Sequence, residues 1–85
     1  MNARIETGSN YANVFIGNLQ IAFSYETVIA FSEDRGGKTF VSENLWGPTT
    51  GKHLKAIDGG RKAERLPRAD FEDAFGAMLK AHKLA

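Results

Sequence analysis

Apolar and polar side chains alternate with a period of two through much of the first half of the chain, and this alternation is typical of β-strands. Short links separate the alternating runs, so they predict an antiparallel meander. Gly17 and Asn18 suit a two-residue hairpin turn, because glycine reaches a positive φ without steric cost. The four predicted strands are Tyr11–Ile16, Leu19–Ser24, Thr27–Ser32 and residues 38–42.

The third of these strands is apolar on both sides. Strict alternation would place Ile29 and Phe31 on one face, together with Thr27, and Val28 and Ala30 on the other. A strand with two apolar faces is typical of a central position in a sheet. We therefore expect residues 27–32 to lie inside the sheet.

Three other segments lack a regular pattern. Residues 1–10 are polar, and we expect them to be frayed. Residues 33–37 have the composition of a loop. Residues 58–66 are polar and contain two glycines, so we expect a mobile loop there. No repeat or second domain is visible, and residues 1–85 are predicted to form a single domain.

The end of the chain changes to apolar spacings of three and four, which are typical of an amphipathic helix. Pro67 suits the first turn of this helix, since its missing N–H costs nothing there. Gly76 costs roughly 1 kcal/mol relative to alanine, and it either permits a close approach to the sheet or is simply tolerated. The apolar stripe consists of Phe71, Ala74, Phe75, Met78, Leu79 and His82.

A shorter helix is expected before it, capped by Thr49 or Thr50 and running to about Ile57, with Leu54 facing inward. The apolar stripe of the last helix must be buried, and one face of the sheet is the available partner. The predicted fold class is therefore α+β. It is a four-stranded antiparallel β-meander with a short helix and a C-terminal α-helix packed on the sheet.

The composition excludes several classes of protein. The chain has 85 residues, of which 42% are hydrophobic and 25% charged, as expected for one globular domain with a small core. The absence of cysteine excludes disulfides and thiolate metal sites, and it suits a reducing cytoplasm. No apolar run is long enough to span a membrane, and the first ten residues lack the apolar core of a signal peptide. We expect a cytoplasmic protein without cofactor, metal or membrane contact.

The net charge of +1 is too small to imply a nucleic-acid partner, but the charges are unevenly distributed. Residues 52–68 contain six basic and two acidic side chains. If this segment met a nucleic acid, its basic side chains would contact phosphates, with Trp46 or Tyr25 stacking on a base. The candidate phosphate contacts are Lys52, Lys55, Arg61, Lys62, Arg65 and Arg68.

The run "GPTTGKH" resembles a nucleotide-binding P-loop, but its spacing is wrong. Three residues separate Gly47 from Gly51, where the motif has four, and His53 replaces the hydroxyl residue that binds magnesium. A milder interpretation remains open. Amides of residues 49–51 at a helix N-terminus, together with the charge of Lys52, would attract an anion.

The two histidines give no convincing catalytic or metal site. Two ligands without cysteine do not make a zinc site, and His82 fits a packed or helix-end position. As a general base, His53 would need a nucleophile and an orienting acid. Ser42, Thr49 or Thr50 and Glu43 or Asp58 are near in sequence, but a histidine satisfied by backbone hydrogen bonds is the simpler interpretation. We expect no enzyme activity.

Two further features concern partners. Trp46 lies beside a glycine and a proline, so it is either a loop anchor or an exposed contact for a partner. Residues 38–42 are a candidate sheet edge, which begins with a lysine that discourages open pairing. An edge is nevertheless a route to a homodimer or to strand addition by a partner.

The chain resembles a family of small bacteriophage proteins. The shared pattern is S-Y-x-T-x-x-A-F, then S-E-N-x-W, then T-T-G-K-H-L, over roughly residues 13–79. The resemblance implies a phage or prophage source and an infected or lysogenic bacterium as the host, but it carries no activity. The matching residues are Ser24, Tyr25, Thr27, Ala30, Phe31, Ser42, Glu43, Asn44, Trp46, Thr49, Thr50, Gly51, Lys52, His53 and Leu54.

Small phage proteins are often made to block a host machine, so the leading hypothesis is a non-enzymatic protein-binding module. Its partner would be a host protein or ribonucleoprotein complex, and the protein would act as an inhibitor of a defence complex, such as an anti-CRISPR protein. The alternative is a small nucleic-acid-binding accessory protein that uses the basic 52–68 segment. The candidate partner-binding residues are Trp46, Thr49, Thr50, Lys52 and His53.

Overall fold

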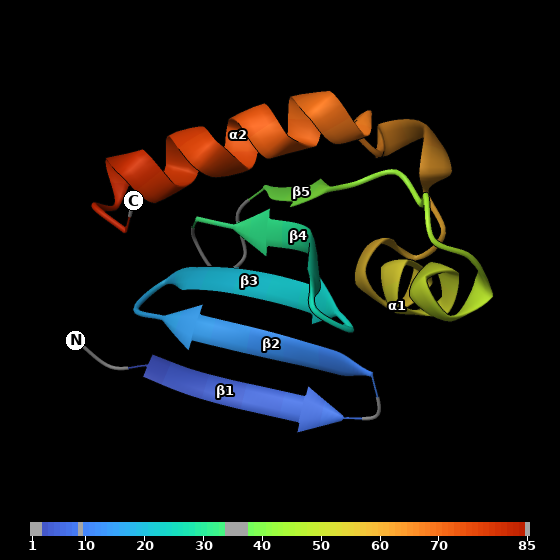
Figure 1. The fold of residues 1–85 in the computed structure, drawn as a ribbon, viewed down its shortest axis with the longest axis horizontal. Helices are drawn as coiled ribbons and strands as arrows, with labels where there is room; N and C mark the ends of the chain where they lie inside the picture. Colours follow the sequence, from blue (N-terminus) through green and yellow to red (C-terminus); the bar gives the residue numbers. More distant parts are fainter. Residues whose placement is uncertain (1–2, 9, 34–37, 85) are drawn as a thin grey trace.

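The computed structural model describes residues 3–8, 10–33 and 38–84. Within these residues, five strands form an antiparallel sheet in the order in which they occur along the chain, and two α-helices pack against it (Figure 1). The α+β class and the antiparallel meander are thus confirmed. The elements are β1 (Ala3–Gly8), β2 (Tyr11–Ile16), β3 (Leu19–Ser24), β4 (Thr27–Ser32), β5 (Thr39–Val41), α1 (Pro48–Asp58), the 3₁₀-helix η1 (Lys62–Glu64) and α2 (Arg68–Ala81).

Strand β1 corrects the predicted strand number from four to five. It occupies a segment that was expected to be frayed, and it pairs with β2 over six consecutive positions, with Ile5 opposite Val14. Ile5 is the only large apolar residue in β1, so the sequence carried little periodic signal there. Pairing with β2 supplies the backbone hydrogen bonds that the local pattern did not predict. Residues 1, 2 and 9 of the expected frayed segment lie outside the described residues.

A β-bulge in β4 changes which side chains face which side of the sheet. Ala22 pairs with Ala30 but Phe23 pairs with Val28, so Ile29 is the extra residue. Two residues of a bulged strand oppose one residue of its partner, which interrupts strict alternation. As a result Ile29 and Ala30 belong to one core cluster and Phe31 to the other. The prediction that Ile29 shares a face with Phe31 is therefore wrong, whereas the interior position of β4 is confirmed.

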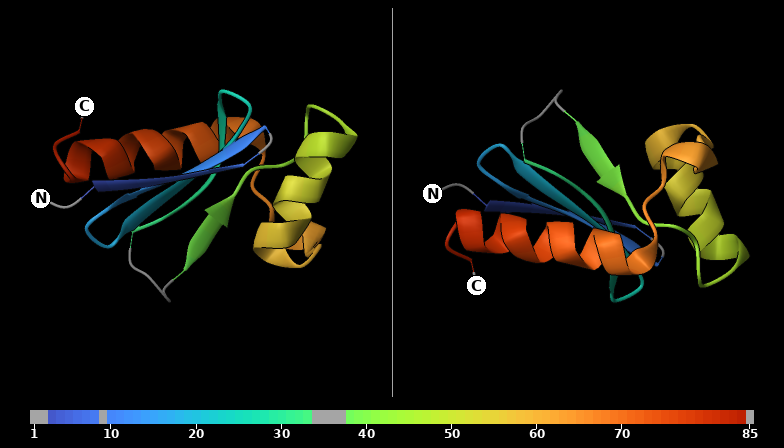
Figure 2. Two further views of the ribbon diagram at one scale, coloured as in Figure 1. Left: turned by 90° about the horizontal axis from the view of Figure 1, so that it is seen from below. Right: turned by 90° about the horizontal axis from the view of Figure 1, so that it is seen from above.

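Helix α2 covers one face of the sheet and builds the larger core. Figure 2 shows it lying lengthwise along that face. Phe31 stacks on Phe40 and packs against Phe71 and Phe75 of α2, with ring centroids 4.9 to 5.6 Å apart. Aromatic pairs at such distances add to the stabilisation that burial provides. The buried members of this cluster are Leu19, Ile21, Phe31, Phe71 and Met78, with Ala74, Phe75 and Leu79 of the predicted stripe packed against them.

Helix α1 packs on the opposite face of the sheet, and its core is smaller. Figure 2 shows it standing at one end of the sheet. Leu54, which is fully buried as predicted, is the one α1 residue of this second cluster. Ile57 was also expected to face inward, but it is 37% exposed. The other buried members of the cluster are Ala22, Ile29, Ala30 and Val41.

The helix ends differ slightly from the predicted ones. Helix α1 begins at Pro48 with Gly47 as its N-cap, and no side chain caps it, so Thr49 and Thr50 are not caps. Gly47 has a φ of 121°, which favours glycine. Helix α2 begins one residue after Pro67, which is its N-cap. None of the helices in the described ranges is long and apolar enough to cross a membrane.

The segment 58–66 runs from the last residue of α1 through a short 3₁₀-helix to the residue before Pro67. Gly59 ends α1 in the left-handed conformation, and the short helix η1 follows. Leu66 then pairs with Ser42 as a parallel bridge, which extends the sheet beside β5. The expected mobility of this segment stays a prediction. Residues 34–37 of the expected 33–37 loop lie outside the described residues.

Candidate partner-binding surface

The side of α1 that faces the sheet is held by a small polar cluster. The hydroxyl oxygen of Ser24, at the end of β3, lies 2.9 Å from Thr50 Oγ1 and 2.8 Å from His53 Nδ1. The Ser24 side chain is buried, and its residue is only 2% exposed. One hydroxyl can donate one hydrogen bond and accept others, so Ser24 can satisfy both partners on α1 at once. Thr50 and His53 therefore attach the helix to the sheet.

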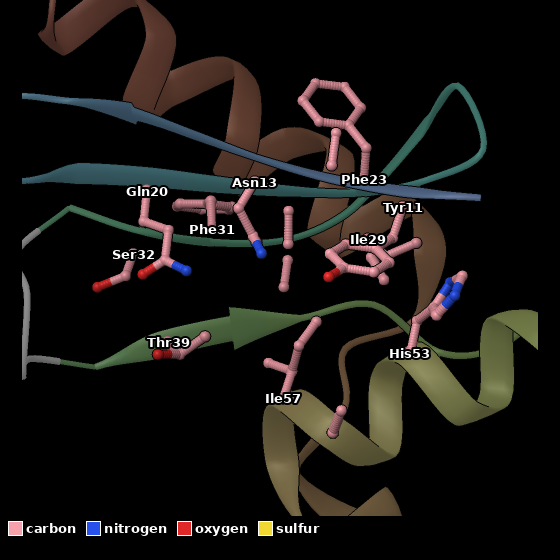
Figure 3. A pocket seen from close by; sticks show the side chains of 14 residues that line it. Tyr11, Asn13, Gln20, Phe23, Ile29, Phe31, Ser32, Thr39, His53 and Ile57 are labelled. Carbon is pink, nitrogen blue, oxygen red and sulfur yellow. The ribbon is translucent and has the colours of Figure 1, made fainter. Parts of the chain in front are cut away.

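A groove of about 580 Å³ lies between α1 and the uncovered part of this sheet face (Figure 3). His53 and Ile57 border the groove on the side of α1. Tyr11 lies at the same end of the groove as His53, and the two ring centroids are 5.7 Å apart. Asn13 and Gln20 reach into it from the sheet. Its described lining contains no Asp, Glu, Lys or Arg, so the groove suits uncharged polar groups.

The histidine contacts differ from those considered in the sequence analysis. His53 meets Ser24 rather than Ser42, Thr49 or an acidic side chain. The Ser24 residue is 2% exposed, and its hydroxyl contacts Thr50 as well as His53. His82 is a helix-end residue, whose Nε2 lies 3.0 Å from Glu33 Oε2. No three His, Asp or Glu side chains in the described ranges are placed to hold a metal ion.

The loop that leads into α1 presents two apolar side chains to solvent. Asn44 Oδ1 accepts hydrogen bonds from the N–H groups of Trp46 and Gly47, and Asn44 Nδ2 donates to the Gly47 carbonyl. This local turn fixes the loop and turns Leu45 outward, where it is 60% exposed. Trp46 is 42% exposed. We call Leu45 and Trp46 the loop tip.

Arg68, the first residue of α2, supports this loop from beneath. Its guanidinium carbon lies 5.0 Å from the ring centroid of Trp46, and its NH1 donates to the Val28 carbonyl at 2.8 Å. Its Nε donates to Glu72. The Arg68 N–H donates to Glu43 Oε2 at 2.6 Å, so Glu43 satisfies one of the free amides at the start of the helix. Trp46 is thus both a loop anchor and an exposed side chain.

Three lysines line a second depression, of about 680 Å³, between α1 and the segment that precedes α2. Lys52 and Lys55 come from the outer side of α1, and Lys62 comes from η1. None of the three takes part in a salt bridge within the described residues. We call this depression, including its Asn44 and Pro48 wall, the basic groove. The loop tip lies between Asn44 and Pro48 in the chain, and these two residues line the groove.

Asp58 and Arg65 form an ion pair beside the basic groove, which Arg65 lines, while Asp58 lines a neighbouring depression. Arg65 Nε donates to Asp58 Oδ2 at 2.7 Å and NH2 donates to Oδ1 at 3.1 Å, while the side chains are only 6% and 9% exposed. The hydrogen bond from Arg65 lowers the pKa of Asp58, and the same bond raises the pKa of Arg65. The pair joins the last residue of α1 to the residue that follows η1, so it closes the segment that carries Lys62.

The structure divides the predicted partner-binding residues between two sides of α1. Thr50 and His53 face the sheet, whereas Lys52 and Thr49 are exposed and Trp46 stands on the loop before the helix. The N–H of Gly51 is bonded to the Gly47 carbonyl, so it is not free for an anion. Among the candidate phosphate contacts, Arg65 and Arg68 have partners within the protein, and Arg61 is exposed. Tyr25 lines a different depression, beside Tyr11.

Two important residues were not singled out in the sequence analysis. Leu45 was overlooked because a single leucine in an irregular loop carries no periodic signal. Ser24 was overlooked because a serine at the end of a predicted strand is not recognisable as buried. Its only signal was its place in the resemblance pattern, which also contains Thr50 and His53.

Comparison with known proteins identifies a family. A family model described as a family of unknown function (DUF8033) matches residues 2–73, from β1 to the beginning of α2. No curated protein and no solved structure matches the chain. The matched range includes the loop tip, the basic groove and the Asp58–Arg65 pair. The bacteriophage source stays a prediction.

Proposed function

The chain belongs to this family of unknown function, and we propose that it is a non-enzymatic module that binds an acidic segment of a partner protein. The observation that carries the proposal is the basic groove, where Lys52, Lys55 and Lys62 converge without salt-bridge partners in the described residues. Carboxylates of a partner would supply the missing counter-charges. Complementary charge of this kind fixes register and speeds association.

The loop tip supplies the apolar part of the proposed interface. Leu45 is an apolar side chain that is 60% exposed. Trp46 is held in position by Arg68 while nearly half of its surface stays open. A rigid, partly exposed tryptophan is typical of binding hot spots, because little entropy is lost when it is buried. The proposed partner therefore presents an apolar pocket next to acidic side chains.

The resemblance to small bacteriophage proteins supports a host defence complex as the class of target. An inhibitor needs only to occupy a functional surface of such a complex, and a compact domain without catalytic machinery is sufficient for that. The target would be a protein or a ribonucleoprotein, with an anti-CRISPR role as one form of the proposal. In this proposal the protein presents the basic surface, so the surface of the target that it blocks would be acidic.

Nucleic-acid binding remains the second candidate, because phosphates would fill the same basic groove. Two observations weigh against it. Arg65 and Arg68, two of the six basic residues that would contact phosphates, are engaged within the protein. Tyr25, one of the two candidates for base stacking, lines a separate depression. The remaining basic side chains provide few phosphate contacts, which predicts a shallow dependence of affinity on salt.

The test is an affinity pull-down from bacterial lysate with and without nuclease, using the full chain. Wild type is compared with Leu45→Asp, Trp46→Ala and the double variant Lys52→Glu/Lys62→Glu. We expect wild type to retain one protein complex even after nuclease treatment. Trp46→Ala should retain roughly 30-fold less of this complex, because a hot-spot residue is lost. The matched control is Lys80→Glu/Lys83→Glu, which changes the net charge equally at the end of α2.

The outcomes separate the candidates. Retention that disappears with nuclease would replace the proposal by nucleic-acid binding at the basic groove. Retention that is equal for wild type and for all groove and tip variants would show that this surface is not the interface. Circular dichroism of each variant confirms that a loss of binding is not a loss of folding.

A further inference from the structure

The two edges of the sheet are treated differently by the rest of the chain. Beside β5, the N–H of Leu66 donates to the Val41 carbonyl and the Leu66 carbonyl accepts from Glu43 N–H, so this edge is partly covered. On the other side, β1 pairs only with β2 within the described residues. Figure 1 shows β1 as the outermost strand, with no helix over its outer edge. An uncovered strand presents unpaired backbone groups that favour pairing with another chain.

The sequence of this edge is self-complementary. Arg4 and Glu6 flank Ile5 on either side, and both charged side chains are more than half exposed. In an antiparallel pair centred on Ile5, Arg4 of one chain lies opposite Glu6 of the other, and the reverse pair follows by symmetry. We propose that β1 pairs antiparallel with β1 of a second copy of this protein, with Ile5 at the two-fold axis.

The charges select this register from its neighbours. Residues directly opposite each other in an antiparallel pair must have side chains on the same face of the sheet. The two-fold axis must therefore pass through a residue, and the nearest alternatives to Ile5 are Arg4 and Glu6. A two-fold axis at Arg4 would place Arg4 opposite Arg4, and an axis at Glu6 would place Glu6 opposite Glu6. Like charges directly opposite are destabilising, while opposite charges stabilise a strand pair. The register centred on Ile5 is the one among these three with two opposite-charge pairs.

The exposed side chain of Ile5 fits the same arrangement. Ile5 is opposite Val14, which packs against the core beneath α2, so Ile5 continues that apolar row beyond the reach of the helix. It is nevertheless 65% exposed. In the proposed pair, Ile5 of each copy would meet Ile5 of the other at the centre of a continuous sheet. This contact removes from water the most exposed large apolar side chain among the described residues.

The charged side chains are already placed on one face. Arg4 Nε lies 3.6 Å from Glu6 Oε2 within the strand, and the Arg4 guanidinium lies 4.5 Å over the Phe15 ring. Both charges therefore stand on the face opposite Ile5, where strand alternation also places them. A second β1 would find them held near the positions that it needs, and each charge would gain a partner from the other chain without changing face.

The test uses sedimentation equilibrium to measure the dimer dissociation constant of the full chain. We expect wild type to dimerise with a measurable constant below roughly 1 mM. The single variants Arg4→Glu and Glu6→Arg should each weaken self-association about tenfold, because each creates two like-charge pairs. Mixing the two variants should restore dimerisation. At positions 4 and 6 one variant carries two acidic side chains and the other two basic ones, so both cross-strand pairs of the heterodimer have opposite charges.

The matched control is Glu26→Arg, which makes the same charge change as Glu6→Arg in the exposed turn between β3 and β4. It should leave the dissociation constant unchanged. The proposal is overturned if wild type stays monomeric up to about 1 mM, if Arg4→Glu and Glu6→Arg dimerise as tightly as wild type, or if the mixture associates no better than either variant alone. Native mass spectrometry of the mixture identifies the heterodimer directly by its mass.

Discussion

The two faces of the sheet are closed in different ways. Helix α2 covers its face with an aromatic cluster in which Phe31, Phe71 and Phe75 pack ring against ring. Helix α1 contributes one buried leucine, Leu54, to the opposite face and is otherwise attached through the hydroxyl of Ser24. Apolar burial thus attaches α2 to one face of the sheet, whereas hydrogen bonds account for much of the attachment of α1 to the other face.

This difference assigns different tasks to the two helices. Apolar burial is the dominant source of stability, so α2 and the sheet are expected to form the most stable unit of the domain. The α1 side buries less apolar surface, and it leaves a groove, three lysines and an exposed loop around the helix. Binding regions are commonly found in the less stable parts of a protein. The proposed partner-binding surface lies on that side.

The largest expected effect on stability comes from truncating a buried phenylalanine of the aromatic cluster. Phe71→Ala should lower the free energy of unfolding by about 4 kcal/mol, because the side chain is fully buried and leaves a cavity. Leu54→Ala, the corresponding change on the α1 side, should cost about 3 kcal/mol. Urea unfolding measures both. If Leu54→Ala proved the more damaging change, the view of α2 as the main stabilising helix would be wrong.

The second prediction concerns the ion pair that connects α1 to the chain before α2. Asp58→Asn should lower the free energy of unfolding by about 2.5 kcal/mol, within the range for a hydrogen bond to a charged group, because Arg65 is left without its counter-charge. Amide hydrogen exchange should at the same time become faster in residues 58–66. A variant that unfolds at the wild-type urea concentration would show that this segment does not depend on the pair.

The pH dependence of wild type follows from the same pair. The hydrogen bond from Arg65 holds the pKa of Asp58 below its ordinary value of 3.8. The carboxylate therefore contributes its full stabilisation above that value and loses it as the pH falls through the lowered pKa. The stability difference between wild type and Asp58→Asn should shrink as the pH is lowered from about 6 to about 2. A constant difference over this range would contradict the assignment.

The fold was predictable wherever one period dominated a whole element. Strands β2 and β3 and the stripe of α2 were predicted from spacing alone, because burial of one face imposes that spacing. Strand β1 was not, since Ile5 is its only large apolar side chain and its pairing depends on β2. The bulge at Ile29 was also missed, because an extra residue in a strand is decided by packing on both faces and leaves no local signature.

The candidate site was predicted only in part, for a similar reason. Trp46 and Lys52 were identified from their residue types, which signal contact and charge regardless of neighbours. The tasks of Thr50 and Arg65 depend on Ser24 and Asp58, which are 26 and 7 residues away in the chain. A sequence without aligned relatives does not reveal such pairs. The basic groove likewise joins Lys62 to Lys52 and Lys55 of α1, and no local pattern in the sequence shows that these side chains line one depression.

A smaller effect is expected at the polar junction of α1. Ser24→Ala should lower the free energy of unfolding by about 2 kcal/mol, because Thr50 and His53 both lose the hydroxyl that satisfies them. Amides of α1 should exchange faster than those of α2 as a result. The matched control is Thr49→Ala, which removes an exposed hydroxyl from the same helix and should change stability little. Equal effects of the two substitutions would mean that hydrogen bonds do not attach this face.

The smallest effect tests the opposite helix and should be a gain. A methyl group at Gly76 would meet nothing within 4 Å, so this glycine does not serve a close approach to the sheet and is simply tolerated. Gly76→Ala should therefore raise the free energy of unfolding by up to about 1 kcal/mol through helix propensity alone. Gly59→Ala is the control, because Gly59 has a φ of 68° and alanine there should cost about 1 kcal/mol. Thermal unfolding followed by circular dichroism compares the two variants. Destabilisation by Gly76→Ala would show that α2 packs more closely on the sheet than its contacts indicate, and the contrast between the two faces would then be larger still.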